Sequence, residues 1–175
     1  GWMTIVMNNR TISEKIYLIT LFIWVVVTSL VTTTYFIRLE GFLSLYKIVL
    51  YFTIAMIFIK ELVNLPRSLY HFRFHWEQLL IAVLFIISMF IVAKNRDGLL
   101  DLNVLLLVFS ARDIDFRKLL GTFSFATFLV LVLTIYASNK GVISNMIMRA
   151  DSGYRFSLGF NYVSFASQRL FFALC

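Results

Sequence analysis

The sequence predicts an all-α protein, a polytopic transmembrane helix bundle with about five spans and the start of a sixth. Three observations lead to this prediction. Hydrophobic residues make up 61% of the 175 residues and charged residues only 14%, whereas soluble domains are about half apolar and about a quarter charged. The apolar residues form long runs, and charged residues bound these runs. A soluble protein of this size cannot bury so much apolar surface, whereas a bilayer solvates it from outside.

The first two spans are expected over residues 16–37 and 42–59. The first lies between Lys15 and Arg38 and contains no charged residue. As a helix it rises about 33 Å, which is enough to cross a hydrocarbon core of about 30 Å. The second ends before Lys60. Neither run is expected to be a strand, because an unpaired strand in lipid leaves its backbone groups without hydrogen bonds.

A polar break that contains Pro66 separates the second span from the third, which is expected over residues 79–93. The next apolar segment, residues 99–111, is short and contains Asp101. It is counted as the fourth span. Because it rises only about 20 Å as a helix, it is expected to be a short helix surrounded by protein or a re-entrant hairpin. Residues 119–137 form an uninterrupted apolar run and are expected to span.

The distribution of Lys and Arg predicts that the N-terminus is cytoplasmic. In this orientation the inner polar breaks carry eight basic residues, and the outer breaks before the tail carry four. The positive-inside rule favours that arrangement. Residues 138–169, with four more basic residues, then form an extracytoplasmic loop, and residues 170–175 begin a further span. Because the chain starts without Met and stops within an apolar run, we expect it to be a piece of a longer membrane protein.

The expected outer loop contains two arginines around a Ser-Gly turn. Guanidinium groups suit phosphate and carboxylate, and glycines let backbone amides approach an anion. Two interpretations remain open, an anion-binding site at the outer membrane surface and a lipid-headgroup anchor in an ordinary loop. The candidate residues are Arg149, Asp151, Ser152, Gly153, Arg155, Ser157 and Gly159.

Other charged patterns are interpreted without a metal, a cofactor or a nucleic acid. Asp113 and Asp115 have the spacing of a metal-binding Asp-x-Asp motif, but they lie among Arg and Lys residues in a short break, which favours a solvated charged turn. His71 and His75 lie near arginines that disfavour a cation, within alternating aromatic residues typical of a membrane interface. The net charge of +7 is scattered along the chain, which favours contacts with membrane lipids over nucleic acid.

The pattern Arg-x-x-x-Gly-x-Arg-x-Ser-Leu-Gly-Phe at residues 149–160, shortly after a span, resembles the Wzy-type oligosaccharide repeat-unit polymerases of bacteria. The charged link at residues 109–120 is also similar to a cytosolic link of that family. These are multi-span polymerases of O-antigen, capsule and exopolysaccharide. The resemblance implies a multi-pass protein of the bacterial cytoplasmic membrane, of which the chain covers the N-terminal half.

The resemblance also implies a reaction and roles for the loop residues. Such enzymes join undecaprenyl-pyrophosphate-linked repeat units on the outer face of the membrane. Arg149 and Arg155 would stabilise the departing pyrophosphate, and Asp151 would accept the acceptor proton or pair with an arginine. The substrate would contact the remaining loop positions, Ser152, Gly153, Ser157 and Gly159. The expected partners are the lipid-linked glycan, membrane lipids, and a chain-length regulator and flippase of the same pathway.

Three other functions remain open at this point. A ligase would use the same lipid-linked donor. A transporter or flippase would need charged or Gly/Pro-broken helices at mid-membrane, which residues 16–37, 79–93 and 119–137 lack. A non-catalytic membrane subunit would leave the two arginines without a role.

Overall fold

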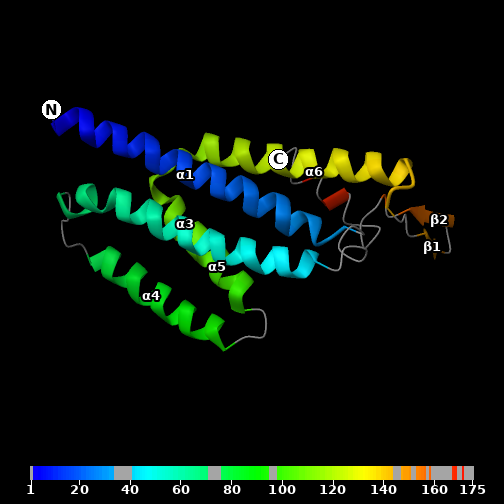
Figure 1. Cartoon of the computed structure of the whole chain (residues 1–175). Coiled ribbons are helices and arrows are strands. Elements are labelled where there is room, and N and C mark those ends of the chain that lie inside the picture. The colour runs from blue at the N-terminus through cyan, green and yellow to red at the C-terminus, as the bar shows by residue number, and fades with distance from the viewer. Residues whose placement is uncertain are drawn as a thin grey trace. The chain divides into compact units, whose positions relative to one another are not determined.

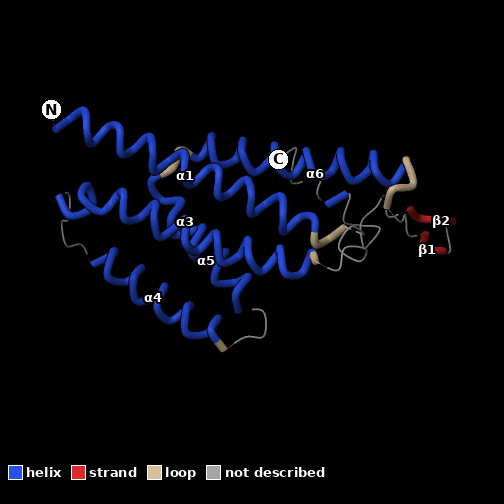
Figure 2. Tube along the Cα trace, in the orientation of Figure 1, coloured by secondary structure: helices blue, strands red, loops and turns tan. Residues whose placement is uncertain are grey.

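The computed structural model of the chain describes residues 2–33, 41–70, 76–94, 98–143, 147–150, 153–156, 158, 167–168 and 171. Helices account for most of this part of the chain (Figure 1): α1 (Trp2–Leu30), α3 (Phe42–Tyr70), α4 (Trp76–Ala93), α5 (Gly98–Ser110) and α6 (Phe116–Asn139). A 3₁₀ turn, η1 (Ala111–Asp113), follows α5. The strands β1 (Ile147–Ala150) and β2 (Gly153–Phe156) follow α6 and pair as an antiparallel hairpin (Figure 2). The predicted helical fold is therefore confirmed.

The chain divides into two compact units. Unit 1 comprises residues Gly1–Thr20 and Leu50–Asp115, and unit 2 comprises Leu21–Val49 and Phe116–Cys175. Helices α1 and α3 contribute to both units. Within unit 1, α4 packs against α5. Unit 2 contains α6 and the hairpin.

The structure supports three membrane spans, not the predicted five with the start of a sixth. Within the described residues, three helices are long and apolar enough to cross a bilayer, Thr11–Leu30, Phe42–Asn64 and Phe116–Asn139. Helix α5, predicted as the fourth span, has 13 residues and rises about 20 Å, less than the hydrocarbon thickness of about 30 Å. Helix α4 has 18 residues and rises about 27 Å. The expected sixth span at residues 170–175 lies outside the described residues except for Phe171.

The helices extend beyond the apolar runs that predict them. Helix α3 continues to Tyr70 through Pro66, where the sequence predicts a polar break from residue 60 onward. A helix closes its own backbone hydrogen bonds, so it can leave the membrane without ending at the first charge. Proline removes one N–H donor from the ladder, and here it does not end the helix. The first span is the exception at its C-terminal end, because α1 ends at Leu30, where the sequence predicts a span to residue 37. Residues 34–37 of that prediction lie outside the described residues.

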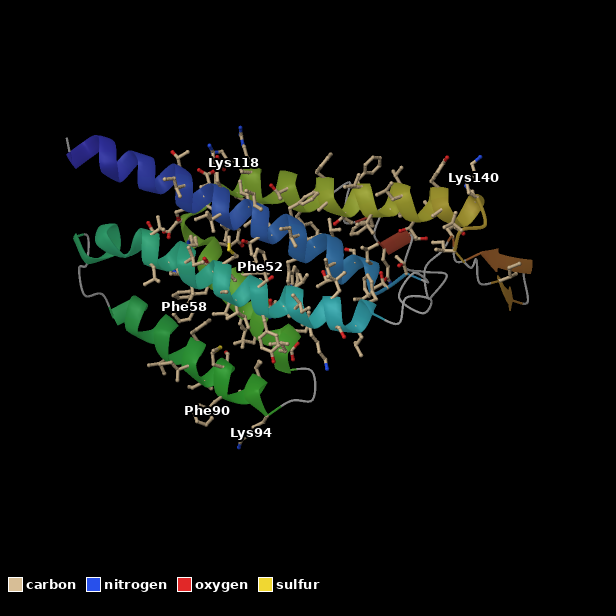
Figure 3. All side chains as sticks on the ribbon, viewed as in Figure 1. Phe52, Phe58, Phe90, Lys94, Lys118 and Lys140 are labelled. Atoms are coloured by element: carbon tan, nitrogen blue, oxygen red, sulfur yellow. The ribbon has the colours of Figure 1, made fainter. Side chains whose placement is uncertain are left out.

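The side-chain distribution of unit 1 is the reverse of that in a soluble domain. Lys60, Asn103 and Thr53 are fully buried, whereas Phe58 and Phe90 are 65% and 71% exposed. Figure 3 labels both side chains, Phe58 on α3 and Phe90 on the side of α4 that points away from α3. Exposed apolar side chains around buried polar ones need an apolar surrounding, because contiguous apolar patches of this kind are rare on soluble monomers. The distribution therefore agrees with lipid around the helices.

In unit 2, α6 buries a face that consists of small and β-branched residues and one leucine. Small residues let helices approach closely, which is the common packing mode inside membranes. Phe22 of α1 stacks on Phe125 of α6, with ring centroids 6.1 Å apart. Lys118 and Lys140 flank the apolar body of α6 (Figure 3). The buried residues of α6 are Ala126, Thr127, Val130, Leu131, Thr134, Ala137 and Ser138.

Helix α6 ends in a glycine cap. Gly141 has φ +70, its N–H donates to the Ser138 carbonyl at 3.1 Å, and the Val142 N–H donates to the Ala137 carbonyl at 2.9 Å. These two bonds form a Schellman motif, which satisfies carbonyls that a helix leaves unpaired. The cap ends the span and starts the segment that leads to the hairpin.

Replacing Gly141 by Ala is expected to lower the free energy of unfolding by about 1 kcal/mol, because an L side chain is strained at positive φ. No atom lies within 4 Å of the added Cβ, so the cost comes from the backbone alone. Detergent-denaturation titration of the purified protein measures it. Gly121→Ala is the matched control, since Gly121 lies within α6 and also has open space. That substitution is expected to stabilise the helix.

Candidate functional site

The structure places three of the seven predicted site residues in the hairpin. Arg149 lies in β1, and Gly153 and Arg155 lie in β2. The other four predicted residues, Asp151, Ser152, Ser157 and Gly159, lie outside the described residues. A hairpin thus occupies part of the predicted outer loop, and the two arginines belong to different strands.

The register of the hairpin separates the two arginine positions. Arg149 is opposite Tyr154, and Arg155 is opposite Met148. Directly opposed residues of an antiparallel pair share a face, and successive residues of a strand alternate between faces. The positions of Arg149 and Arg155 therefore belong to opposite faces of the hairpin. The sequence spacing alone does not predict this separation.

Leu158 ties the end of the hairpin segment to α6. It is half-buried and packs, together with Ile135, against the buried Leu131. Its φ of 54 lies in the left-handed region, which a non-glycine residue rarely occupies without compensation. Packing against α6 supplies such compensation. Leu158 is thereby held against the middle of α6.

A second polar cluster lies in unit 1, and the sequence analysis does not predict it. It joins α3 to the end of α5 and to η1. We call it the Lys60 network, and it consists of Lys60, Glu61, Asn64, Ser110, Arg112 and Asp113.

Lys60 is the buried centre of the network. Its side chain is fully buried, and its Nζ donates hydrogen bonds to the Ser110 carbonyl at 2.8 Å and to Glu61 Oε1 at 3.0 Å. Asp113 Oδ2 lies 3.5 Å from the same Nζ. The nitrogen also lies 5.9 Å from the centroid of the Tyr17 ring, within the range of a cation–π contact. Two carboxylates, a carbonyl and an aromatic face therefore surround this ammonium.

Glu61 connects the buried centre to the exposed rim. Its Oε1 also accepts a hydrogen bond from the Ser110 hydroxyl at 2.9 Å. Its Oε2 accepts one from Arg112 Nη2 at 2.8 Å. The side chain of Arg112 is 40% exposed, and it lies over the Phe109 ring at 4.4 Å from the centroid. Glu61 thus links the fully buried Lys60 to the exposed Arg112.

Asp113 is held at the rim by three groups. Its Oδ2 accepts a hydrogen bond from Asn64 Nδ2 at 2.7 Å and lies within ion-pair distance of Lys60 and Arg112. Both carboxylates of the network are thus paired with cations of the chain itself, so a metal is not needed to balance them. The charged turn expected at Asp113 is solvated, with 36% of the Asp113 side chain exposed, and it is also part of the junction between α3 and α5.

The end of α5 is closed by side chains of other helices. The last carbonyls of a helix have no partners within it. Here the Leu107 carbonyl accepts a hydrogen bond from the Tyr17 hydroxyl at 2.9 Å, and the Ser110 carbonyl accepts one from Lys60. Leu107 and Ser110 are 4% and 0% exposed. The helix therefore ends inside unit 1, where protein donors replace water.

A signal for this network does exist in the sequence. Lys60 and Glu61 stand together at the end of an apolar run, and Arg112 and Asp113 follow another. Charges within a membrane span are costly unless they are paired, and Lys60 and Glu61 lie within the span Phe42–Asn64. Two adjacent pairs of opposite charge at the ends of two apolar runs therefore indicate a contact, although not its geometry.

No protein-family model, curated protein or solved structure matches the chain.

Proposed function

We propose that the chain belongs to a membrane glycan polymerase of the Wzy type, located in the bacterial cytoplasmic membrane. Such an enzyme joins undecaprenyl-pyrophosphate-linked oligosaccharide units into a surface polysaccharide on the outer face of the membrane. The observation that carries the proposal is an arginine-bearing hairpin that directly follows a membrane-length apolar helix, α6. The resemblance of residues 149–160 to the polymerase pattern supports the same assignment.

The number of spans supports an outer position for the hairpin. An odd number of crossings puts the segment after α6 on the side opposite the N-terminus. With three spans, ten of the 16 Lys and Arg residues fall on the inner side and six on the outer, as the positive-inside rule requires. We further propose that α4 and α5 enter the membrane together as a helical pair. Five crossing helices would leave the hairpin on the same side, and they would move Lys94 and Arg96 outward, so that the inner and outer counts of basic residues become eight and eight.

The proposed reaction exchanges one bond at the anomeric carbon of the growing glycan. The bond to the lipid pyrophosphate breaks, a bond to an acceptor sugar hydroxyl forms, and the hydroxyl proton is released. Negative charge grows on the leaving pyrophosphate, and a guanidinium group stabilises it by charge-assisted hydrogen bonds. Arg149 and Arg155 are the candidates for this role in the proposal. Asp151 accepts the proton or orients an arginine.

The remaining predicted residues complete the proposed substrate site. Gly153 begins β2, where the absence of a side chain lets a phosphate approach the backbone. Ser152 and Ser157 contribute hydroxyl donors, and Gly159 contributes a second position of close approach. No cofactor takes part in this scheme.

The register of the hairpin sharpens the proposal. Because the two arginine positions belong to opposite faces, one pyrophosphate is expected to contact one arginine directly. The other arginine is expected to bind a second anionic group, such as the pyrophosphate of the acceptor unit. Single substitutions should therefore differ in effect, and they should differ in whether the donor or the acceptor binds less tightly.

Arg149→Lys and Arg155→Lys are each expected to shorten the polymer made in cells that produce the protein, and at least one should reduce polymerisation tenfold or more. Lysine keeps the charge but loses the planar fork that binds phosphate at two points. Gel electrophoresis of the lipid-linked and polymerised glycan measures the chain length. Lys140→Met is the matched control, since Lys140 is an exposed cation at the same end of α6.

The side of the membrane is measured separately. A cysteine at Ser152, in a background with Cys175 replaced by Ser, should react with an impermeant maleimide in intact cells. Reaction only after lysis would place the hairpin in the cytoplasm and overturn the proposed function. Normal polymer length in both arginine variants would overturn the catalytic roles while leaving the topology intact.

A further inference from the structure

The Lys60 network has no part in the glycan chemistry proposed above, yet it contains a fully buried lysine. Burying an ammonium is costly unless it is paired and hydrogen-bonded. The surroundings of Lys60 Nζ have the features of a cation site. They combine the carbonyl end of α5, two carboxylates and the face of Tyr17.

We propose that unit 1 contains a binding site for a primary ammonium group, which Lys60 itself occupies, and that this tethered cation holds the end of α5 and η1 against α3. The site is defined by the Ser110 carbonyl, Glu61, Asp113 and the ring of Tyr17. It does not depend on the proposed function. Its ligand class is a compact cation with N–H donors.

The hydrogen-bond geometry indicates a primary ammonium rather than charge alone. Nζ donates to two acceptors at 2.8 and 3.0 Å, the Ser110 carbonyl and Glu61 Oε1. The third contact, with Asp113 Oδ2, is 3.5 Å long. A cation without N–H groups would balance the charge but could not satisfy the carbonyl at the end of α5. That carbonyl is buried, so water does not replace the missing donor.

The charge balance explains why the site should remain attractive when it is vacated. Lys60 and Arg112 balance Glu61 and Asp113 in the intact network. Without Lys60 the cluster carries an excess negative charge, and the carbonyl end of α5 adds to it through the helix dipole. A free ammonium ion of the right length should therefore bind in place of the lost side chain.

The position of the site gives it a mechanical consequence. Only two residues separate η1 from α6 in the chain, so whatever holds η1 also holds the residues that lead into α6. The exposed Arg112 contact is the outer part of the junction, and Lys60 is its buried part. Loss of Lys60 should therefore release the last turn of α5 and η1 more than loss of Arg112 does.

The test is amide hydrogen exchange of a peptide that covers residues 104–114, measured on the detergent-solubilised protein by mass spectrometry. Lys60→Ala should raise the exchange rate of this peptide tenfold or more. n-Propylammonium, which has the atoms that the substitution removes from Cγ to Nζ, should restore protection. Tetramethylammonium at the same concentration should not. Lys47→Ala is the matched control, because Lys47 lies on the same helix and is exposed, and it should change nothing.

Two results would overturn the proposal. One is unchanged exchange in Lys60→Ala. The other is equal rescue by both cations, which would mean that general screening, not a site with hydrogen-bond acceptors, restores the structure.

A further pair of variants covers the case in which Lys60→Ala does not fold. Lys60→Met leaves one uncompensated carboxylate, whereas Lys60→Met with Glu61→Gln restores neutrality. The double variant should yield at least threefold more folded protein by size-exclusion chromatography. Equal yields would show that charge compensation at this site does not hold the junction, and the proposal would fail.

Discussion

Replacement of Glu61 by Gln is expected to lower the free energy of unfolding by about 3 kcal/mol, since removing one partner of a buried ion pair leaves the other charge uncompensated. Glu61 Oε1 contacts Lys60 Nζ and the Ser110 hydroxyl, and Oε2 contacts Arg112. One substitution therefore weakens three interactions of the Lys60 network. Since 28% of the Glu61 side chain is exposed and Asp113 remains near Lys60, the value is placed at the lower end of the usual range.

The experiment is a denaturation titration of the purified protein in mixed detergent micelles, compared with Asp115→Asn. Asp115 is exposed and lies two residues from Asp113, and Asn can still accept a hydrogen bond there, so its substitution should change stability much less than Glu61→Gln does. Adding Asp113→Asn to Glu61→Gln should lower stability further, because Lys60 then loses both carboxylates. If Glu61→Gln lowers the free energy of unfolding no more than Asp115→Asn does, the contact between Lys60 and Glu61 does not stabilise the protein, and the prediction is wrong.

Replacement of Tyr17 by Ala is expected to lower the free energy of unfolding by about 4 kcal/mol, in the range of buried aromatic-to-alanine changes. Tyr17 is 2% exposed, so truncation leaves a cavity beside Lys60. It also removes the donor that satisfies the buried Leu107 carbonyl. Packing and hydrogen bonding are therefore lost together.

Tyr17→Phe separates these two losses, because it keeps the ring and removes only the hydroxyl. It should cost about 1–2 kcal/mol, the penalty of a buried carbonyl without its donor. Tyr51→Ala is the control, since Tyr51 is 63% exposed on α3, and its effect on the same titration should be small. Equal effects of Tyr17→Phe and Tyr17→Ala would mean that the ring contributes no packing and would contradict the buried position of Tyr17.

The positions of the helices were largely predictable, because the bilayer permits few alternatives for a long apolar run. The run at residues 119–137 predicts a helix that the structure extends to Phe116–Asn139. The short segment at residues 99–111 predicts a short helix, and α5 has 13 residues. Helix α3 is the exception, because the sequence treats Lys60 and Pro66 as the end of the helix, and the structure carries the helix through both.

The number of membrane spans was predicted less well than the positions of the helices. Hydropathy identifies an apolar segment, but length decides whether it crosses, and α5 is too short to do so alone. The hairpin at Arg149 and Arg155 was not predicted either. Its strands have four residues each, too few for a period-2 pattern to stand out among turn residues.

The candidate site in the segment after α6 rests on residue types and spacing, and both can be read from the sequence. Guanidinium groups and glycines have their anion-binding chemistry in any fold. Which face of the hairpin each arginine position occupies depends on strand register, because a shift of one residue exchanges the faces. The sequence alone does not specify that register.

By itself the sequence determined that this protein is helical, apolar and suited to a membrane. A long apolar run forms a helix in lipid through its own backbone hydrogen bonds, so it needs no contact with another part of the chain. Only the tertiary structure decided that Lys60 is the buried centre of a network and that Tyr17 closes the end of α5. The physical reason is that a buried charge is tolerated only where acceptors from distant parts of the chain converge on it. Residues 17, 60 and 110 meet through helix packing, which no local pattern along the chain encodes.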